Sequence, residues 1–115
     1  MLDTSLLCRA ARDPNQPVWT IASLGGNDVI ALNAMYVIHE AGLSVPEDIS
    51  VVGYDNIAQA AINNPPLTTV GYPKSAMADW SARRLFELIK NPDAEPATCV
   101  IPTELVIRRS TMESR

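Results

Sequence analysis

Residues 44–56 decide the fold of this chain, and they read SVPEDISVVGYDN. Residues 49–54 are almost continuously apolar or β-branched, and Pro46-Glu47-Asp48 before them has turn chemistry. This pattern predicts a short strand that is buried on both faces of a sheet. Asp55 follows the strand directly. Because ligands of open α/β sheets bind beyond the carboxyl ends of the strands, Asp55 is the first candidate for a ligand contact.

Strands and helices alternate on both sides of this segment. The pattern predicts further strands over residues 18–24, 67–70, 98–101 and 104–108, and helices over residues 29–41, 57–62 and 74–90. Gly42 is expected to end the first of these helices as a left-handed cap, with Leu43 folding back on it. Such alternation predicts an α/β fold, a parallel sheet with flanking helices and right-handed crossovers.

The two ends of the chain give weaker patterns. Residues 2–12 have helical spacing and read as the last turns of a helix, which suggests that the N-terminal part of a larger protein precedes them. The tail from Ser110 onward is expected to be loose.

Composition limits the classes of function. The 115 residues suffice for one domain with a real core. A net charge of −4, with Arg83-Arg84 and Arg108-Arg109 as the only basic pairs, argues against a nucleic-acid groove on this chain. The sequence has neither a membrane span nor a signal peptide, which favours the cytoplasm. The two cysteines lack metal-ligand spacing and are expected to pack as small apolar groups, so no metal or cofactor is expected.

The helix expected over residues 29–41 is apolar on more than one side. One stripe holds Ile30, Ala34 and Ile38. Further apolar residues widen it: Val29, Leu32, Met35 and Tyr36. A helix of this kind must be covered twice, so one face is expected to meet the sheet and another a partner, a second copy of the chain.

Three polar residues follow predicted strands: Asn27, Asp55 and Tyr72. Parallel strands deliver such residues to one edge, where an amide, a carboxylate and a phenol together recognise hydroxyl groups. This set predicts a site for a sugar or another small polar molecule. Each residue also has a plainer interpretation: Asn27 and Asp55 as helix caps, and Tyr72 as a packing residue.

Other polar residues give weaker indications of a functional site. Asp28 is expected to complement the dipole of the helix that follows it, and Glu47 and Asp48 to form a solvated turn at the amino end of their strand. His39, the single histidine, lies inside a predicted helix. Nucleophile-elbow, P-loop and G-x-G-x-x-G motifs are absent from the sequence, so an enzyme is not expected.

Four blocks of the sequence resemble the C-terminal third of LacI/GalR-type bacterial transcription regulators. They occur in the order found in that family and cover most of the chain from Pro17 onward. The blocks are NDVIAL at residues 27–32, AGLSVPEDISVVGYD at 41–55, PPLTTV at 65–70 and PTELVIR at 102–108.

The resemblance implies a periplasmic-binding-protein-like effector domain of type I, of which residues 1–115 are part. It implies that residues 74–90 belong to the other lobe and that a DNA-binding headpiece lies outside this chain, so that DNA is contacted only through that headpiece. Effector contacts fall on Asn27, Asp55 and Tyr72. The homodimer interface falls on the two helices that hold Met35, Tyr36, Ile57 and Ala61.

Three alternatives stay open at this point. A sugar-binding protein of a transport system has the same fold and the same ligand edge, and is the main rival. An enzyme of flavodoxin-like fold is more distant. A truncated chain without a function of its own is the third.

Overall fold

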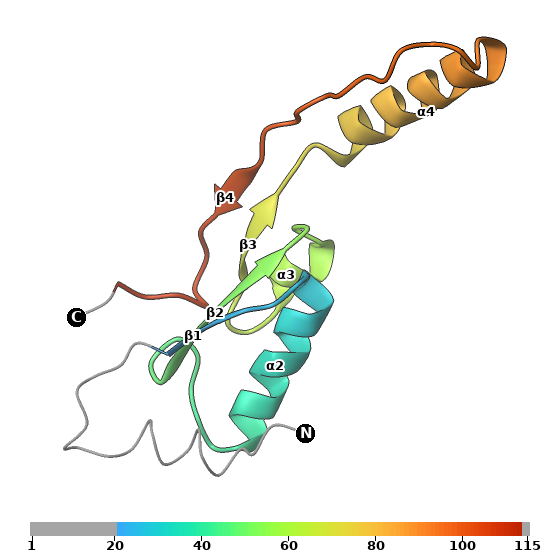
Figure 1. Cartoon of the computed structure of the whole chain (residues 1–115). Helices are drawn as coiled ribbons and strands as arrows, with labels where there is room; N and C mark the ends of the chain where they lie inside the picture. Colours follow the sequence, from blue (N-terminus) through green and yellow to red (C-terminus); the bar gives the residue numbers. More distant parts are fainter. Residues whose placement is uncertain (1–20, 114–115) are drawn as a thin grey trace. The chain divides into compact units, whose positions relative to one another are not determined.

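The structure, a computed structural model, describes residues 21–113 (Figure 1). The helical turns predicted over residues 2–12, and residues 18–20 of the first predicted strand, lie outside this range. The predicted bounds of the central strand and of the long helix are confirmed. The elements are β1 (Ile21–Leu24), α2 (Asp28–Glu40), β2 (Ile49–Tyr54), α3 (Ala58–Ile62), β3 (Thr68–Gly71), α4 (Lys74–Lys90) and β4 (Glu104–Val106).

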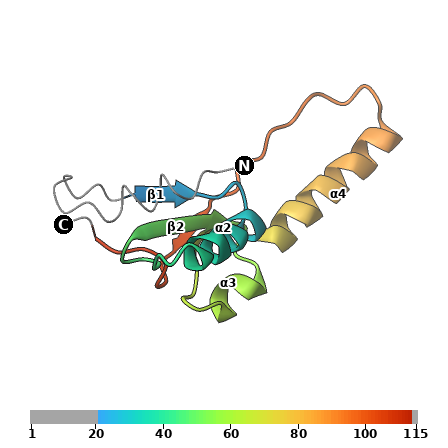
Figure 2. The same cartoon turned by 90° about the horizontal axis from the view of Figure 1, so that it is seen from below.

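The strands form one sheet in the order β1-β2-β3-β4. β1 and β3 both pair with β2 in parallel, with Leu24 opposite Val52 and Gly53 opposite Thr69. β4 runs opposite to β3 in Figure 1, so the sheet is parallel in its first three strands and mixed at its end. In Figures 1 and 2, α2 lies along one face of β1 and β2. Consecutive residues of β2 are buried, which confirms that both of its faces are covered.

Two compact units make up the chain. The first unit comprises the described residues of Met1–Gly71 and Leu105–Arg115, and the second unit is Tyr72–Glu104. The strand predicted over residues 98–101 was wrong, because these residues form no strand and Val100 is 88% exposed. β-branched residues favour a strand only where a neighbouring strand can pair with them.

The core of the first unit joins α2 to the sheet. Of the apolar residues of α2, Ala31, Met35 and Ile38 are buried, whereas Ile30 is 56% exposed. Asp28 is buried at the start of the helix and shares this face, so the helix turns Ala31, Met35 and Ile38 inward. The core residues are Ala31, Met35, Ile38, Leu43, Ile49, Val51, Ala60 and Leu67.

The two turns before β2 follow the sequence closely. Gly42 adopts a φ of 74°, and its N–H donates to the carbonyl of His39. Leu43 is buried and its N–H donates to the carbonyl of Ile38, which confirms the predicted left-handed cap. Asp48 closes the next turn by accepting from the Ser44 N–H at 2.7 Å.

The segment after β4 is not loose, contrary to the expectation from the sequence. Ser110 is fully buried, and its Oγ donates to the carbonyl of Val51 at 2.6 Å and accepts from the N–H of Thr68 at 2.8 Å. The N–H of Val51 donates to the carbonyl of Ser110 at 2.8 Å. Ser110 therefore forms sheet-like hydrogen bonds with Val51 of β2 and with Thr68, the first residue of β3.

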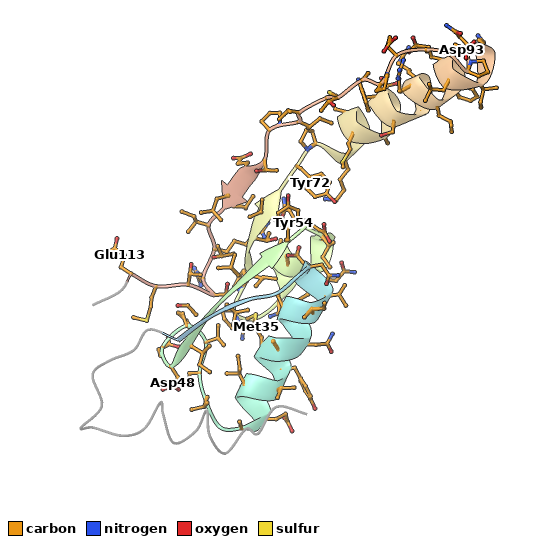
Figure 3. The ribbon with its side chains drawn as sticks, in the orientation of Figure 1. Met35, Asp48, Tyr54, Tyr72, Asp93 and Glu113 are labelled. Carbon is orange, nitrogen blue, oxygen red and sulfur yellow. The ribbon has the colours of Figure 1, made fainter. Side chains whose placement is uncertain are left out.

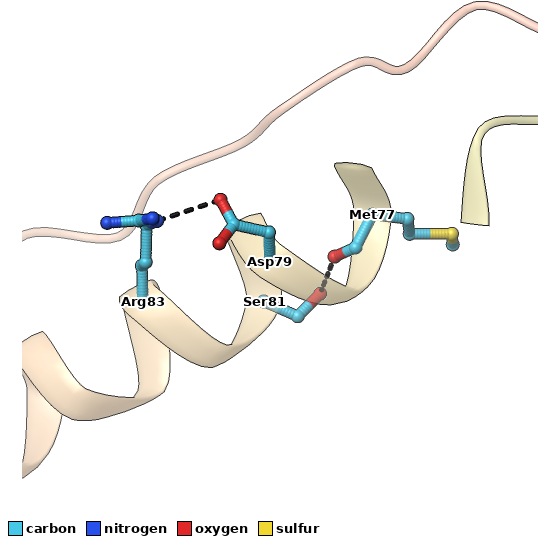
Figure 4. Close-up of polar contacts among 4 residues, drawn as sticks. All are labelled: Met77, Asp79, Ser81 and Arg83. Atoms are coloured by element: carbon cyan, nitrogen blue, oxygen red, sulfur yellow. Dashed lines mark hydrogen bonds and ion pairs between the residues drawn. The ribbon is translucent and has the colours of Figure 1, made fainter. Parts of the chain in front are cut away.

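The second unit consists of α4 and the chain that follows it. Arg83 and Asp79 form an exposed ion pair at 2.7 Å, and the Ser81 hydroxyl donates to the carbonyl of Met77 (Figure 4). The hydrogen bond from Arg83 lowers the pKa of Asp79, and the same bond raises that of Arg83.

Within this unit α4 leaves large apolar side chains exposed. None of its 17 residues is buried. Phe86 and Ile89 are more than half exposed, and Cys99 is exposed rather than packed, contrary to the expectation. Among the described residues, no helix is long and apolar enough to cross a membrane.

We predict that Ser110→Ala lowers the free energy of unfolding by about 1–3 kcal/mol, because the N–H of Thr68 and the carbonyl of Val51 lose a buried partner. Denaturant unfolding measures the change. Ser44→Ala is the matched control, because the Ser44 side chain is exposed, and its effect should stay within about 0.5 kcal/mol. Equal stability of the two variants would contradict the role given to Ser110.

Candidate ligand-binding edge

Two loops lie side by side at the carboxyl end of the parallel strands. The loop after β1 is tied to β2 by the Gly25 N–H, which donates to the carbonyl of Val52 at 2.9 Å. The loop after β2 is tied to the start of α2, because the Ile57 N–H donates to Asp28 Oδ2 at 2.8 Å. Figure 3 shows Tyr54 at this end of β2 and Asp48 at the opposite end.

Asn27 is the N-cap of α2. Its Oδ1 accepts from the N–H of Ile30 at 2.9 Å, and its backbone is extended as an N-cap requires. The side chain is half-buried. The plainer interpretation of Asn27 is thus confirmed, and a ligand contact through its amide group stays a prediction.

Asp28 does far more than complement a helix dipole. Its carboxylate is fully buried, and Oδ1 accepts from the Thr69 hydroxyl while Oδ2 accepts from the Ile57 N–H. It therefore joins α2, β3 and the loop after β2. A buried carboxylate is tolerated only when its oxygens are satisfied in this way. One local signal in the sequence pointed to it, an acid beside an N-cap, but its partners are distant along the chain.

Gly53 makes room for this carboxylate. A Cβ at Gly53 would lie 2.2 Å from Asp28 Oδ1 and 2.8 Å from Leu67 Cδ2. Both distances are too short for real contacts, so β2 can approach the buried acid only without a side chain at this position.

Asp55 lies in a turn of unusual backbone. It is half-buried, its φ is 116°, and the φ of Asn56 is 50°. Its N–H donates to the carbonyl of Val70 at 2.8 Å. α3 begins with Ile57 at its N-cap position, without a side-chain cap, so the interpretation of Asp55 as a helix cap is wrong.

Tyr72 belongs to the second unit, whereas Asn27 and Asp55 belong to the first. Its side chain is half-buried, and the Lys74 ammonium lies 4.8 Å from the centre of its ring. Asn27 and Asp55 thus lie in two loops of the first unit that are tied together, and the ligand contacts of all three residues stay predictions.

A shallow cavity of about 440 Å³ lies at the opposite end of α2 from Asn27. Met35, buried between α2 and the sheet, borders it together with Tyr36, which is 64% exposed. Of the other predicted interface residues, Ile57 is half-buried and Ala61 is exposed. The cavity is lined by Leu32, Met35, Tyr36, His39, Leu43, Ser44, Val45, Glu47, Asn63, Asn64 and Pro65.

A lobe with parallel strands, covered by helices and offering polar loops at its carboxyl edge, is typical of periplasmic-binding-protein-like folds. The chain matches the periplasmic binding protein-like domain family over residues 2–111, and it belongs to that family.

Its relatives are regulators. The chain is 48% identical over 84 residues to the HTH-type transcriptional repressor PurR of Pasteurella multocida (strain Pm70). The matched stretch covers 73% of this chain and 25% of the relative. The chain thus spans about a quarter of the length of the curated relatives it matches.

Solved structures agree with this. The transcriptional regulator CelR in complex with cellobiose is 37% identical with a TM-score of 0.72, over 77% of this chain and 27% of that one. A LacI family regulator from Enterococcus faecium with bound ribose is 29% identical with a TM-score of 0.72, over 94% of this chain and 38% of that one. The resemblance to LacI/GalR-type regulators is confirmed.

We predict that Gly53→Ala lowers the free energy of unfolding by about 1–3 kcal/mol or more, because the added methyl group overlaps Asp28 and Leu67. Thermal or denaturant unfolding measures this. Gly26→Ala is the matched control: a Cβ there meets only Ile30 Cδ1 at 3.9 Å, so stability should change by less than about 1 kcal/mol. A harmless Gly53→Ala would show that the Asp28 carboxylate can move.

Proposed function

We propose that this chain is the effector-binding and dimerisation part of a LacI/GalR-type transcription regulator. The observation that carries the proposal is the pair of loops holding Asn27 and Asp55 at the carboxyl edge, in a chain similar to transcriptional repressors and to regulators with bound cellobiose or ribose. The effector is a sugar or a sugar derivative, and the regulator acts in the cytoplasm, where its DNA lies.

Asp55 supplies the acceptor in this proposal. A carboxylate that accepts from sugar hydroxyls contributes about 1.5–3 kcal/mol to binding. The Oδ1 atom of Asn27 accepts the capping hydrogen bond of α2, and its NH₂ group can donate to a hydroxyl oxygen of the ligand. Tyr72 contributes a phenol from the second unit.

The second unit fits the other lobe of the effector domain. We assign residues 74–90 to that lobe because α4 exposes apolar side chains such as Phe86 and Ile89. A DNA-binding headpiece outside this chain contacts the operator. Effector that bridges the lobes favours one conformation by its differential affinity, and the dimer transmits the change to the headpieces.

The dimer forms through one flank of α2 together with α3. Tyr36 on α2 is 64% exposed, and Ala61 and Ile62 on α3 are exposed, Ile62 to 82%. Met35, by contrast, is buried in the core beside this surface, and Ile57 is half-buried. An exposed apolar surface of this kind is typical of an interface between subunits.

A sugar-binding protein of a transport system is not favoured, because the relatives are transcriptional repressors and regulators. The same relatives argue for a regulator rather than an enzyme.

We predict that Asp55→Ala in the full-length protein weakens sugar binding tenfold or more, the loss expected for one charge-assisted acceptor. Titration calorimetry with cellobiose and ribose measures the affinity. Asp93→Ala, which removes an exposed carboxylate from the second unit, is the control and should bind like the unchanged protein. Unchanged affinity of Asp55→Ala would remove this residue from the site.

We predict that Tyr36→Glu dissociates the full-length protein into monomers, because a carboxylate would have to be buried in the interface. Sedimentation velocity measures the oligomeric state. Val37→Glu is the matched control, since Val37 is 46% exposed on the other flank of the same helix, and this variant should stay dimeric. Dissociation of both variants, or of neither, would contradict the assigned flank.

A further inference from the structure

The turn that carries Asp55 is held against its own backbone preference. Asp55 and Asn56 are the two non-glycine residues with positive φ among the described residues, at 116° and 50°. Such conformations persist only where the surrounding structure determines them. The contacts of this turn therefore decide where the Asp55 carboxylate points.

Backbone bonds hold the turn from two elements. Asp55 N–H donates to the carbonyl of Val70 at 2.8 Å, and Asn56 N–H reaches the Thr69 hydroxyl at 3.4 Å, both on β3. Ile57 N–H donates to Asp28 on α2 at 2.8 Å. Three successive N–H groups are thus satisfied, but none of these bonds fixes the Asn56 side chain.

Arg108 holds that side chain from a third element, the segment after β4. Its Nη2 donates to Asn56 Oδ1 at 2.7 Å, and its Nη1 donates to the carbonyl of Leu67 at 2.8 Å. Its backbone N–H donates to Thr68 Oγ1 at 2.9 Å, which fixes the base of the side chain. The guanidinium is half-buried and spans from the start of β3 to the turn after β2.

The Asn56 side chain has little freedom on its other side. A Cβ at Gly71 would lie 3.3 Å from both Asn56 Cβ and Asn56 Nδ2, so the amide group packs closely against the backbone of β3. The amide is enclosed between Gly71 and Arg108. Gly71 and the arginine fork thus constrain the orientation of this amide from two sides.

We propose that Arg108 is a positioning residue for effector binding, which orients Asp55 by clamping Asn56. This proposal rests on the proposed function of Asp55. A planar guanidinium reaches two acceptors in fixed geometry, and the single ammonium of a lysine cannot do so. The segment after β4 thereby becomes part of the ligand edge without touching the ligand.

Amide hydrogen exchange of the full-length protein without ligand tests the clamp directly. In Arg108→Lys, the amides of residues 55–57 should exchange at least about tenfold faster, while those of the β1–β2 ladder keep their rates. Arg109→Lys is the matched control, because the Arg109 side chain is exposed, and should leave all rates unchanged. Unchanged exchange at residues 55–57 in Arg108→Lys would overturn the inference.

Variants of Asn56 test the clamp from its other end and cover the case in which Arg108→Lys does not fold. Asn56→Asp keeps an acceptor for Arg108 and tolerates a positive φ, so the amides of residues 55–57 should exchange as slowly as in the unchanged protein. Asn56→Gly is compatible with the backbone conformation but removes the acceptor, so the amides of residues 55–57 should exchange faster. Equal exchange in the two variants would also overturn the proposal.

A double-mutant cycle links the clamp to the ligand. With cellobiose and ribose as probes, Arg108→Lys should weaken binding about tenfold, and should add nothing once Asp55→Ala is present. Additive losses would show that Arg108 does not act through Asp55. Faster exchange in Arg108→Lys together with unchanged affinity in Asp55→Ala would leave the clamp intact and refute the proposed function of Asp55, so the two failures are distinguishable.

Discussion

The first unit depends on one buried carboxylate. Asp28 accepts a hydroxyl hydrogen bond from β3 and a backbone hydrogen bond from the loop after β2, while its own backbone starts α2. A carboxyl group is costly to bury unless its oxygens are hydrogen-bonded. The helix rotation, the glycine in β2 and the position of the Ile57 N–H are therefore coupled, and none of them can shift without leaving a buried polar atom unsatisfied.

Local patterns predicted the elements of this fold well. The bounds of β2 follow from its apolar run, because a strand buried on both faces admits few polar residues. The end of α2 follows from Gly42, because only a residue without a Cβ adopts a φ of 74° at little cost. These signals lie within a few residues of the feature they determine, so a sequence pattern can contain them.

Contacts between distant segments could not be predicted in this way. Asp28 and Thr69 are far apart in the chain, and the burial of Ser110 depends on β2 and β3 lying beside it. The strand expected over residues 98–101 had suitable residues but no neighbour. Of the candidate site, the sequence indicated Asn27 and Asp55, but it gave no sign of the positive φ at Asp55 or of the fork on Asn56.

The turn at the proposed ligand edge is held from three sides, and this bears on how the proposed regulator would select a ligand. β3, α2 and the segment after β4 each hold the turn at Asp55 and Asn56 by hydrogen bonds between groups of the protein itself. A carboxylate that is already ordered before binding loses little conformational entropy when the ligand binds, so more of its interaction energy appears as affinity. A rigid acceptor also discriminates among hydroxyl arrangements, because a hydroxyl that is displaced or missing forms a poorer hydrogen bond with it. In the proposed regulator the first unit would thus set which ligand is accepted, while closure against the other lobe would convert that choice into a change of the dimer.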